Sequence, residues 1–173
     1  MLEEIKNAEN QWKHQRITIK DLLLCAFLIL ICNLVGYISS IIQFNSIRAW
    51  YPSLSKSMLT PPNFVFPIVW SLLYILIGVS TCLSYKKARK KEKSFVIFVY
   101  ALQLLFSFLW VVLFFGLKAP LMAFVEILFY IFIVLNMMNI YKRYSSISYI
   151  LLYPYLFWVV FATYLNLIII IKN

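Results

Sequence analysis

Histidine, glycine and acidic residues are all scarce in this chain of 173 residues. The sequence holds one histidine, three glycines, and six aspartate and glutamate residues. A single histidine, His14, cannot form a Ser-His-Asp or Cys-His arrangement, nor a metal site built on a Cys/His cluster. The glycines lie far apart, so there is no glycine-rich phosphate loop. These absences disfavour hydrolysis, phosphoryl transfer and metal redox chemistry, and we predict no metal site.

Charged side chains are also few, whereas apolar ones are abundant. Only 13% of the residues are charged and 64% are hydrophobic. A soluble domain has about 25% charged and about 45–50% apolar residues. A water-soluble core of this size could not bury such a surplus, so the sequence predicts an integral membrane protein.

Five continuous apolar runs are each about 20 residues or longer, enough to cross a hydrocarbon core of about 30 Å as a helix. They are Leu22–Ile42, Phe64–Tyr85, Phe95–Phe115, Ala119–Tyr141 and Tyr149–Ile171. Their side chains show no in/out alternation, which disfavours a β-barrel. We expect an all-α membrane protein, a single bundle of five transmembrane helices. Residues 1–20 form a polar cytoplasmic tail and residues 21–173 the helical domain.

The net charge of +10 follows the expected membrane topology and does not indicate nucleic-acid binding. With five spans, twelve Lys and Arg residues fall on the side of the N-terminus and four on the other. The positive-inside rule then puts the N-terminus in the cytoplasm, and the C-terminus and first loop outside, with the plasma membrane as the expected location. The basic run Lys86–Lys93 is explained either as a topology anchor or as a contact for anionic lipid headgroups.

All three cysteines, Cys25, Cys32 and Cys82, lie inside predicted spans. We expect them to act as small hydrophobic side chains, without a disulfide framework. Cys32, Gly36 and Ser40 recur at every fourth residue, which allows a close approach of another helix.

The connector between the first two spans, residues 50–70, is long, aromatic and rich in proline. A loop between membrane helices needs only a few polar residues, so this one is expected to fold as a cap over the outer end of the bundle. Beneath it, four spans direct aromatic or polar stripes at the same outward half of the bundle. The stripes are Trp70 and Tyr74, then Ser107, Trp110 and Phe114, then Glu126, then Trp158, Ala162 and Asn166.

These stripes predict a pocket of flat indole faces with one acid and one amide, suited to a large planar apolar ligand. A carboxylate at the depth of Glu126 costs about 2.5 kcal/mol or more unless it is paired or faces the bundle interior. Two plainer explanations stand beside the pocket: membrane-interface anchoring by Trp and Tyr, and ordinary bundle packing.

Three ordered motifs carry a resemblance to a known family. The first is Trp-Tyr-x-x-Leu-x-Lys, then Thr-Pro-Pro, then Phe-Pro-x-x-Trp, met by Trp50, Tyr51, Leu54, Lys56, Thr60, Pro61, Pro62, Phe66, Pro67 and Trp70. The second is Trp-x-x-x-Phe-Phe-Gly, met by Trp110, Phe114, Phe115 and Gly116. The third is Pro-Tyr-Leu-x-Trp-x-x-x-Ala-x-x-Leu-Asn, met by Pro154, Tyr155, Leu156, Trp158, Ala162, Leu165 and Asn166. The chain resembles the TspO/MBR family of tryptophan-rich sensory proteins, related to the mitochondrial translocator protein.

The resemblance implies five transmembrane helices, a ligand cavity under the first loop, and binding of porphyrins such as protoporphyrin IX. With the stripes above, the expected ligand-binding residues are Tyr51, Pro61, Phe66, Trp70, Tyr74, Ser107, Trp110, Glu126, Trp158 and Ala162. Porphyrin is expected as a ligand, with no cofactor required. A homodimer through the third span is a further implication, although that span lacks a GxxxG signal.

Some positions depart from the family pattern. Ser57 and Leu59 stand where the family usually has Pro and Trp, which removes one aromatic residue from the lid. Ser107 replaces the usual Asn, and Glu126 replaces the usual Asp, which keeps the charge but adds a methylene. We therefore expect a ligand preference of its own, and sterol binding is left open.

Three functions compete at this point. The first is a membrane receptor or sensor that binds porphyrin. The second is enzyme-like: the resemblance implies light- and oxygen-dependent porphyrin degradation with Trp70 and Trp158 as the candidate catalytic residues. The third, a porphyrin or lipid transporter, is disfavoured because no inverted repeat or broken helix is apparent. The residues leave enzymatic activity open and favour a binder.

Overall fold

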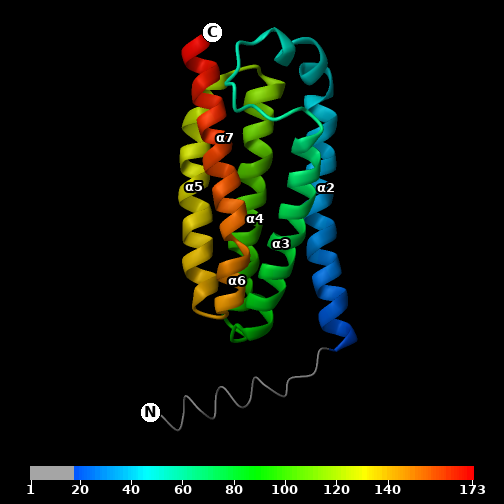
Figure 1. The fold of residues 1–173 in the computed structure, drawn as a ribbon. Helices are drawn as coiled ribbons and strands as arrows, with labels where there is room; N and C mark the ends of the chain where they lie inside the picture. Colours follow the sequence, from blue (N-terminus) through cyan, green and yellow to red (C-terminus); the bar gives the residue numbers. More distant parts are fainter. Residues whose placement is uncertain (1–17) are drawn as a thin grey trace.

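The computed structural model describes residues 18–173, and its regular elements in that range are helices (Figure 1). Five helical stretches are long and apolar enough to cross a membrane: Ile19–Ala49, Val65–Lys87, Lys93–Gly116, Pro120–Lys142 and Ser146–Lys172. Each overlaps one predicted span, so the predicted five-helix membrane bundle is confirmed. Of the predicted polar tail, residues 1–17, with His14, lie outside the described residues.

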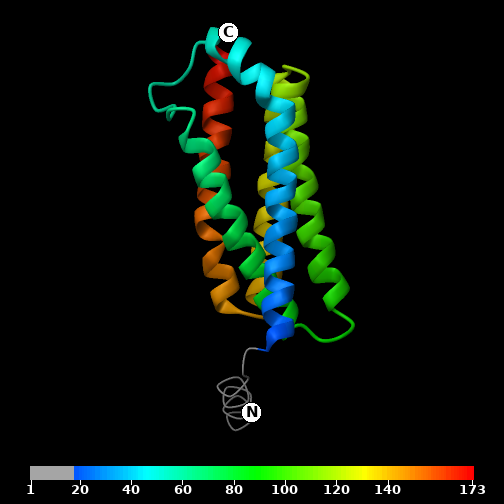
Figure 2. The same ribbon diagram turned by 90° about the vertical axis from the view of Figure 1, so that its right-hand side faces the viewer.

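Successive long helices run in opposite directions (Figures 1 and 2). The elements are α2 (Ile19–Ala49), η1 (Tyr51–Ser53), α3 (Val65–Lys87), α4 (Lys93–Val111), η2 (Val112–Gly116), α5 (Pro120–Lys142), α6 (Ser146–Leu151) and α7 (Tyr153–Lys172). α2 packs against α3 and α4, and α5 packs against α4 and α7. η1 is a single 3₁₀ turn, and η2 is a π-helical turn that continues α4. We call the upper end in Figure 1, where residues 50–64 join α2 to α3, the connector end. The opposite end, with the loops after α3 and α5, is the basic end.

α2 is longer than the apolar run that predicts it, because it continues past Ile42 to Ala49. Its start is fixed by a capping box: the Asp21 N–H donates to Thr18 Oγ1, and the Thr18 N–H donates to Asp21 Oδ2 at 2.9 Å. Asp21 also accepts from the Lys86 ammonium at 2.7 Å, which ties the first turn of α2 to the last turn of α3.

The last span is not one continuous helix. α6 ends at Leu151 and α7 begins at Tyr153, with Pro154 in its first turn. Proline has no N–H to donate to the carbonyl four residues earlier, so the helical ladder is interrupted here. This interruption, which lies toward the basic end, was not apparent from the sequence.

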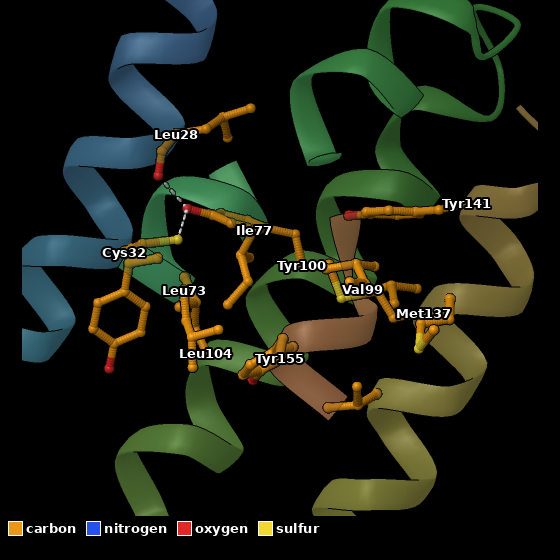
Figure 3. Close-up of a cluster of buried hydrophobic side chains, with 14 of the residues drawn as sticks. Leu28, Cys32, Leu73, Ile77, Val99, Tyr100, Leu104, Met137, Tyr141 and Tyr155 are labelled. Atoms are coloured by element: carbon orange, nitrogen blue, oxygen red, sulfur yellow. Dashed lines mark hydrogen bonds between the residues drawn. The ribbon is translucent and has the colours of Figure 1, made fainter. Parts of the chain in front are cut away.

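Buried tyrosines join the helices in the core (Figure 3). The Tyr100 hydroxyl donates to the Leu28 carbonyl at 2.6 Å and lies 3.1 Å from Cys32 Sγ, which links α4 to α2. The Tyr155 hydroxyl donates to Gln103 Oε1 at 2.6 Å and bonds Tyr130, which links α7 to α4 and α5. These hydrogen bonds satisfy polar groups whose burial without a partner would destabilise the protein.

Two glycines allow α2 and α3 to pack closely. A Cβ on Gly78 would stand 2.6 Å from Ile29 Cγ1 and 2.9 Å from the Ile29 Cα. A Cβ on Gly36 would stand 2.4 Å from Tyr74 Cε2, so Gly36 makes room for the Tyr74 ring. The small-residue ridge on the first span therefore serves packing inside the chain.

Cys25 and Cys82 form a disulfide between α2 and α3, 57 residues apart in sequence. This corrects the expectation that all three cysteines act as plain hydrophobic side chains. The two thiols meet because the glycine contact brings the two helices close together. Cys32 alone is free, and it is buried.

Candidate functional site

A cavity of about 570 Å³ lies in the connector half of the bundle, between α2, α3, α4 with η2, and α7. Small-molecule sites are typically about 300–1,000 Å³ and mostly apolar, with a few placed polar groups. Exposed side chains of α2, Tyr37 and Phe44, line the same cavity as buried ones such as Phe114. The cavity is therefore open to the surroundings along α2.

Three indoles from three different helices form its wall: Trp70 on α3, Trp110 on α4 and Trp158 on α7. The spacing rule explains why they meet, because each belongs to a stripe of residues three or four apart on one helix face. Neither Trp70 nor Trp158 is turned to the lipid, and the space between them is hollow rather than filled by aliphatic side chains.

Each indole is held by aromatic neighbours. Trp110 stacks on Phe114 with ring centroids 5.0 Å apart and planes 17° apart. Trp158 meets Phe66 edge-on at 5.8 Å. Trp70 lies 5.5 Å from Tyr74 and 6.4 Å from Tyr155. Aromatic pairs in such geometries contribute about 0.5–1.5 kcal/mol beyond their area, so the wall is pre-formed.

Polar contacts at this wall fall into two kinds. Trp110 Nε1 donates to Asn166 Oδ1 at 3.3 Å, so this donor is already engaged within the protein. Trp158 Nε1 is buried and has no hydrogen-bond partner. A buried N–H without a partner lowers the stability of the folded wall at this point.

The α2 wall was missed by the sequence interpretation. It carries the polar lining residues Asn33, Tyr37, Ser39, Ser40, Gln43 and Arg48. Asn33, Tyr37, Ser40 and Phe44 recur at intervals of four, three and four, so a helical stripe was present in the sequence. From the sequence, Gly36 and Ser40 were explained by close helix approach alone. Asn33 donates to the Ile29 carbonyl of its own helix at 2.9 Å.

Eight of the ten predicted site residues line this cavity. They are Tyr51, Phe66, Trp70, Tyr74, Ser107, Trp110, Trp158 and Ala162. Pro61 and Glu126 do not line it. Pro61 lies in the connector, and Glu126 is buried on α5, with neither carboxylate oxygen hydrogen-bonded. Contact with a ligand stays a prediction for all ten.

The connector is attached to the end of α7 above the cavity. Asn173 accepts from the Ser55 N–H at 2.9 Å and donates to the Ser55 carbonyl at 3.1 Å. The Ser57 hydroxyl lies 3.1 Å from that of Tyr164. These contacts hold the connector over the end of the bundle, where Figure 1 shows it beside the C-terminus.

Tyr51 connects this loop to the cavity. Its ring packs 5.7 Å from Phe115, and the Lys56 ammonium lies 4.6 Å from the ring centroid while donating to the Tyr51 carbonyl at 2.8 Å. Burial raises the pKa of the Tyr51 phenol above its ordinary value. A phenol is protonated at neutral pH even at its ordinary pKa, and burial reinforces this, so the hydroxyl is available as a donor.

Within residues 18–173, no three His, Cys, Asp or Glu side chains are grouped so that they could hold a metal ion. The cavity lining contains one charged side chain, Arg48, and no carboxylate. What the cavity offers is aromatic faces, amide and hydroxyl groups, and one cation.

Comparison with known proteins agrees with this architecture. Residues 28–171 match the TspO/MBR family. The chain belongs to the TspO/MBR family. The Tryptophan-rich protein TspO of Chlorobaculum tepidum is 36% identical over 156 residues, covering 89% of this chain and 98% of that protein. The Archaeoglobus fulgidus protein of the same name is 36% identical over 140 residues, covering 80% of this chain and 90% of its own. The Translocator protein of Ovis aries is 34% identical over 119 residues, covering 68% of this chain and 70% of its own.

Membership in this family supports a membrane sensory or ligand-binding role. One relative, from Cereibacter sphaeroides, is named a Tryptophan-rich sensory protein and is 32% identical over 118 residues, 68% of this chain and 70% of that protein. The five apolar helices make this chain a multi-pass integral membrane protein, with the lipid bilayer as its environment.

Proposed function

We propose that this protein binds a planar tetrapyrrole, of the protoporphyrin IX type, in the cavity between α2, α3, α4 and α7. The observation that carries the proposal is the convergence of Trp70, Trp110 and Trp158 on one hollow of about 570 Å³. Flat π-systems are attracted to aromatic faces in offset-stacked or edge-on geometry, and three indoles on separate helices present such faces to one guest.

The charges of the lining favour a neutral or anionic guest. Arg48 is the one charged side chain on the cavity, so a carboxylate substituent at the rim would find a partner and a cationic one would not. A flat macrocycle with acidic side groups meets this condition, and no resident cofactor is needed.

Quenching of tryptophan fluorescence by protoporphyrin IX, measured in the dark, tests the proposal. We expect saturable quenching at micromolar porphyrin and about a tenfold weaker affinity for Trp70→Ala and Trp158→Ala, since stacking of a flat ring on an aromatic side chain contributes about 1–3 kcal/mol. Trp50→Ala is the matched control. Trp50 packs on Phe114 at 5.6 Å but does not line the cavity.

An equal loss of porphyrin affinity in Trp50→Ala would show that the quenching reports general aromatic packing and not binding in the cavity. An absence of quenching at micromolar porphyrin would overturn the proposal.

Light- and oxygen-dependent breakdown of the bound porphyrin is the second candidate, favoured by the position of Trp70 between two tyrosines, Tyr74 and Tyr155. Dioxygen would add both of its atoms across a methine C=C bond of the photo-excited macrocycle and cleave it into two carbonyl groups, so that no external reductant is consumed, while Trp70 and Trp158 hold the ring in place. Illumination in air should then bleach the porphyrin band faster with this protein than with the Trp70→Phe/Trp158→Phe variant. Equal bleaching would remove this candidate, while dark binding would still test the first.

Three further proposals concern the membrane topology, transport and the oligomeric state. The asymmetry of Lys and Arg favours a cytoplasmic basic end in the plasma membrane, with the connector outside. Transport of porphyrin or lipid ranks last, because the break at Leu152 lies outside the cavity lining. Homodimerisation through α4 stays a prediction of the family resemblance.

A further inference from the structure

A second hollow lies on the flank of the bundle, separate from the aromatic cavity. It measures about 640 Å³ and runs between α2 and α4, with Tyr85 of α3 at its foot. Its lining is almost wholly apolar and includes Leu24, Phe27 and Ile38 of α2 and Ile97, Ala101 and Leu105 of α4. It shares no residue with the aromatic cavity.

The groove follows α2 from Leu24 to Ile38. At about 1.5 Å per residue this is about 21 Å. One leaflet of a bilayer contributes about half of a hydrocarbon core of about 30 Å. The groove therefore covers the depth of one leaflet, starting near the basic end.

The two polar groups of the lining are tyrosines. Tyr100 is buried and its hydroxyl donates to the Leu28 carbonyl, so the middle of the groove offers no donor to a ligand. Tyr85 stands at the foot, and the Lys93 ammonium lies 4.6 Å from its ring centroid. A cation is thus held at the point where the apolar groove meets the headgroup level.

The surroundings of that foot are strongly basic. Lys20, Arg89, Lys90 and Lys91 are exposed there. Of the acids at this end within residues 18–173, Asp21 pairs with Lys86, and Glu92 accepts from the Arg89 N–H at 3.2 Å. Figure 2 shows the α3–α4 loop at the lower end of the bundle, at the foot of α4.

From this geometry we infer that the α2–α4 groove is a binding site for one acyl chain of an anionic phospholipid, whose phosphate headgroup lies between Lys93 and the α3–α4 loop. An apolar trough one leaflet long, with cations at its headgroup end, matches both parts of such a lipid. The basic run after α3 then recognises a lipid in addition to fixing topology.

Native mass spectrometry of the detergent-purified protein tests the site, with phosphatidylglycerol and phosphatidylcholine of identical acyl chains. We expect one phosphatidylglycerol per chain, retained about tenfold more tightly than phosphatidylcholine. Lys93→Gln should lower the affinity for phosphatidylglycerol about fivefold and leave that for phosphatidylcholine unchanged. Lys142→Gln is the matched control, because Lys142 also lies over a tyrosine ring, 5.2 Å from the Tyr149 centroid, but away from the groove.

Filling the groove gives a second, independent test. Ala101→Trp places an indole in the α2–α4 groove and should lower the affinity for both lipids about tenfold. Val125→Trp, on an exposed part of α5, should leave both affinities unchanged. Quenching by protoporphyrin IX should be unaffected in both variants, which separates this inference from the proposed function and reports on the fold.

Three results would overturn the inference. Lys142→Gln could lower the affinity for phosphatidylglycerol as much as Lys93→Gln does, which would mean that the lipid responds to general surface charge. Both lipids could bind equally well to the wild-type chain, which would mean no headgroup recognition. Ala101→Trp could instead convert dimers into monomers without loss of lipid, which would make the groove an interface between two copies of the chain.

Discussion

Trp110 Nε1 donates to Asn166 Oδ1 at 3.3 Å, and this bond joins α4 to α7 across the end of the aromatic cavity. Asn166 then donates through Nδ2 to the Pro120 carbonyl at 2.9 Å, which joins α7 to the start of α5. One buried amide therefore ties three helices together at the level where the indoles meet, and it keeps Trp110 stacked on Phe114.

Asn166→Leu removes both of these bonds while roughly keeping the volume. We expect it to destabilise the bundle by about 1–2 kcal/mol, because interhelical hydrogen bonds in membranes contribute about 0.6 kcal/mol each on average and the Pro120 carbonyl also loses its donor. Thermal unfolding in detergent measures the loss. Asn136→Leu is the control, since Asn136 is exposed and donates only to Phe132 of its own helix, and a loss as large in that variant would contradict this account.

The contact between Gly78 and Ile29 sets the approach of α2 to α3. In Gly78→Ala the new Cβ would stand 2.6 Å from the Ile29 side chain and 2.9 Å from its backbone, so the two helices must separate. Overpacking of this kind costs about 1–3 kcal/mol. The same unfolding assay should show this loss for Gly78→Ala and little change for Gly116→Ala, where the nearest atom to the new Cβ is 3.4 Å away. Equal changes in stability in the two variants would mean that helix propensity, and not packing, determines the effect of alanine at both positions.

The sequence could predict the number of helices, their approximate ends and the meeting of Trp70, Trp110 and Trp158. Each of these follows from hydrophobic length or from spacing on one helix face, which are local properties. The α2 wall of the cavity was readable in the same way but was attributed to packing, because Gly36 and Ser40 fit both explanations.

Other features depend on which helices become neighbours, and the sequence does not reveal this. Cys25 and Cys82 are 57 residues apart, and their pairing follows from the crossing of α2 and α3. The position of Glu126 outside the cavity lining depends on the rotation of α5, which a single carboxylate on an otherwise apolar helix does not determine.

The disulfide between α2 and α3 can be tested by counting thiols in the denatured protein. Without reductant we expect a maleimide to label one cysteine per chain, Cys32, and with reductant all three. Cys25→Ser frees Cys82, so two cysteines per chain should be labelled with or without reductant. Three labelled cysteines in the unreduced wild-type protein would contradict the pairing.

Glu126 provides a test of where the ligand lies. Both of its carboxylate oxygens are buried without a hydrogen-bond partner, and the residue is absent from the cavity lining. Glu126→Gln keeps the shape and removes the ionisable group, whose ionised form is costly inside a membrane. We therefore expect the variant to be at least as stable as the wild type and to bind protoporphyrin IX within about twofold of it, while Trp158→Ala binds about tenfold more weakly. A tenfold loss in Glu126→Gln, measured by fluorescence quenching, would place the ligand against α5 and outside the aromatic cavity.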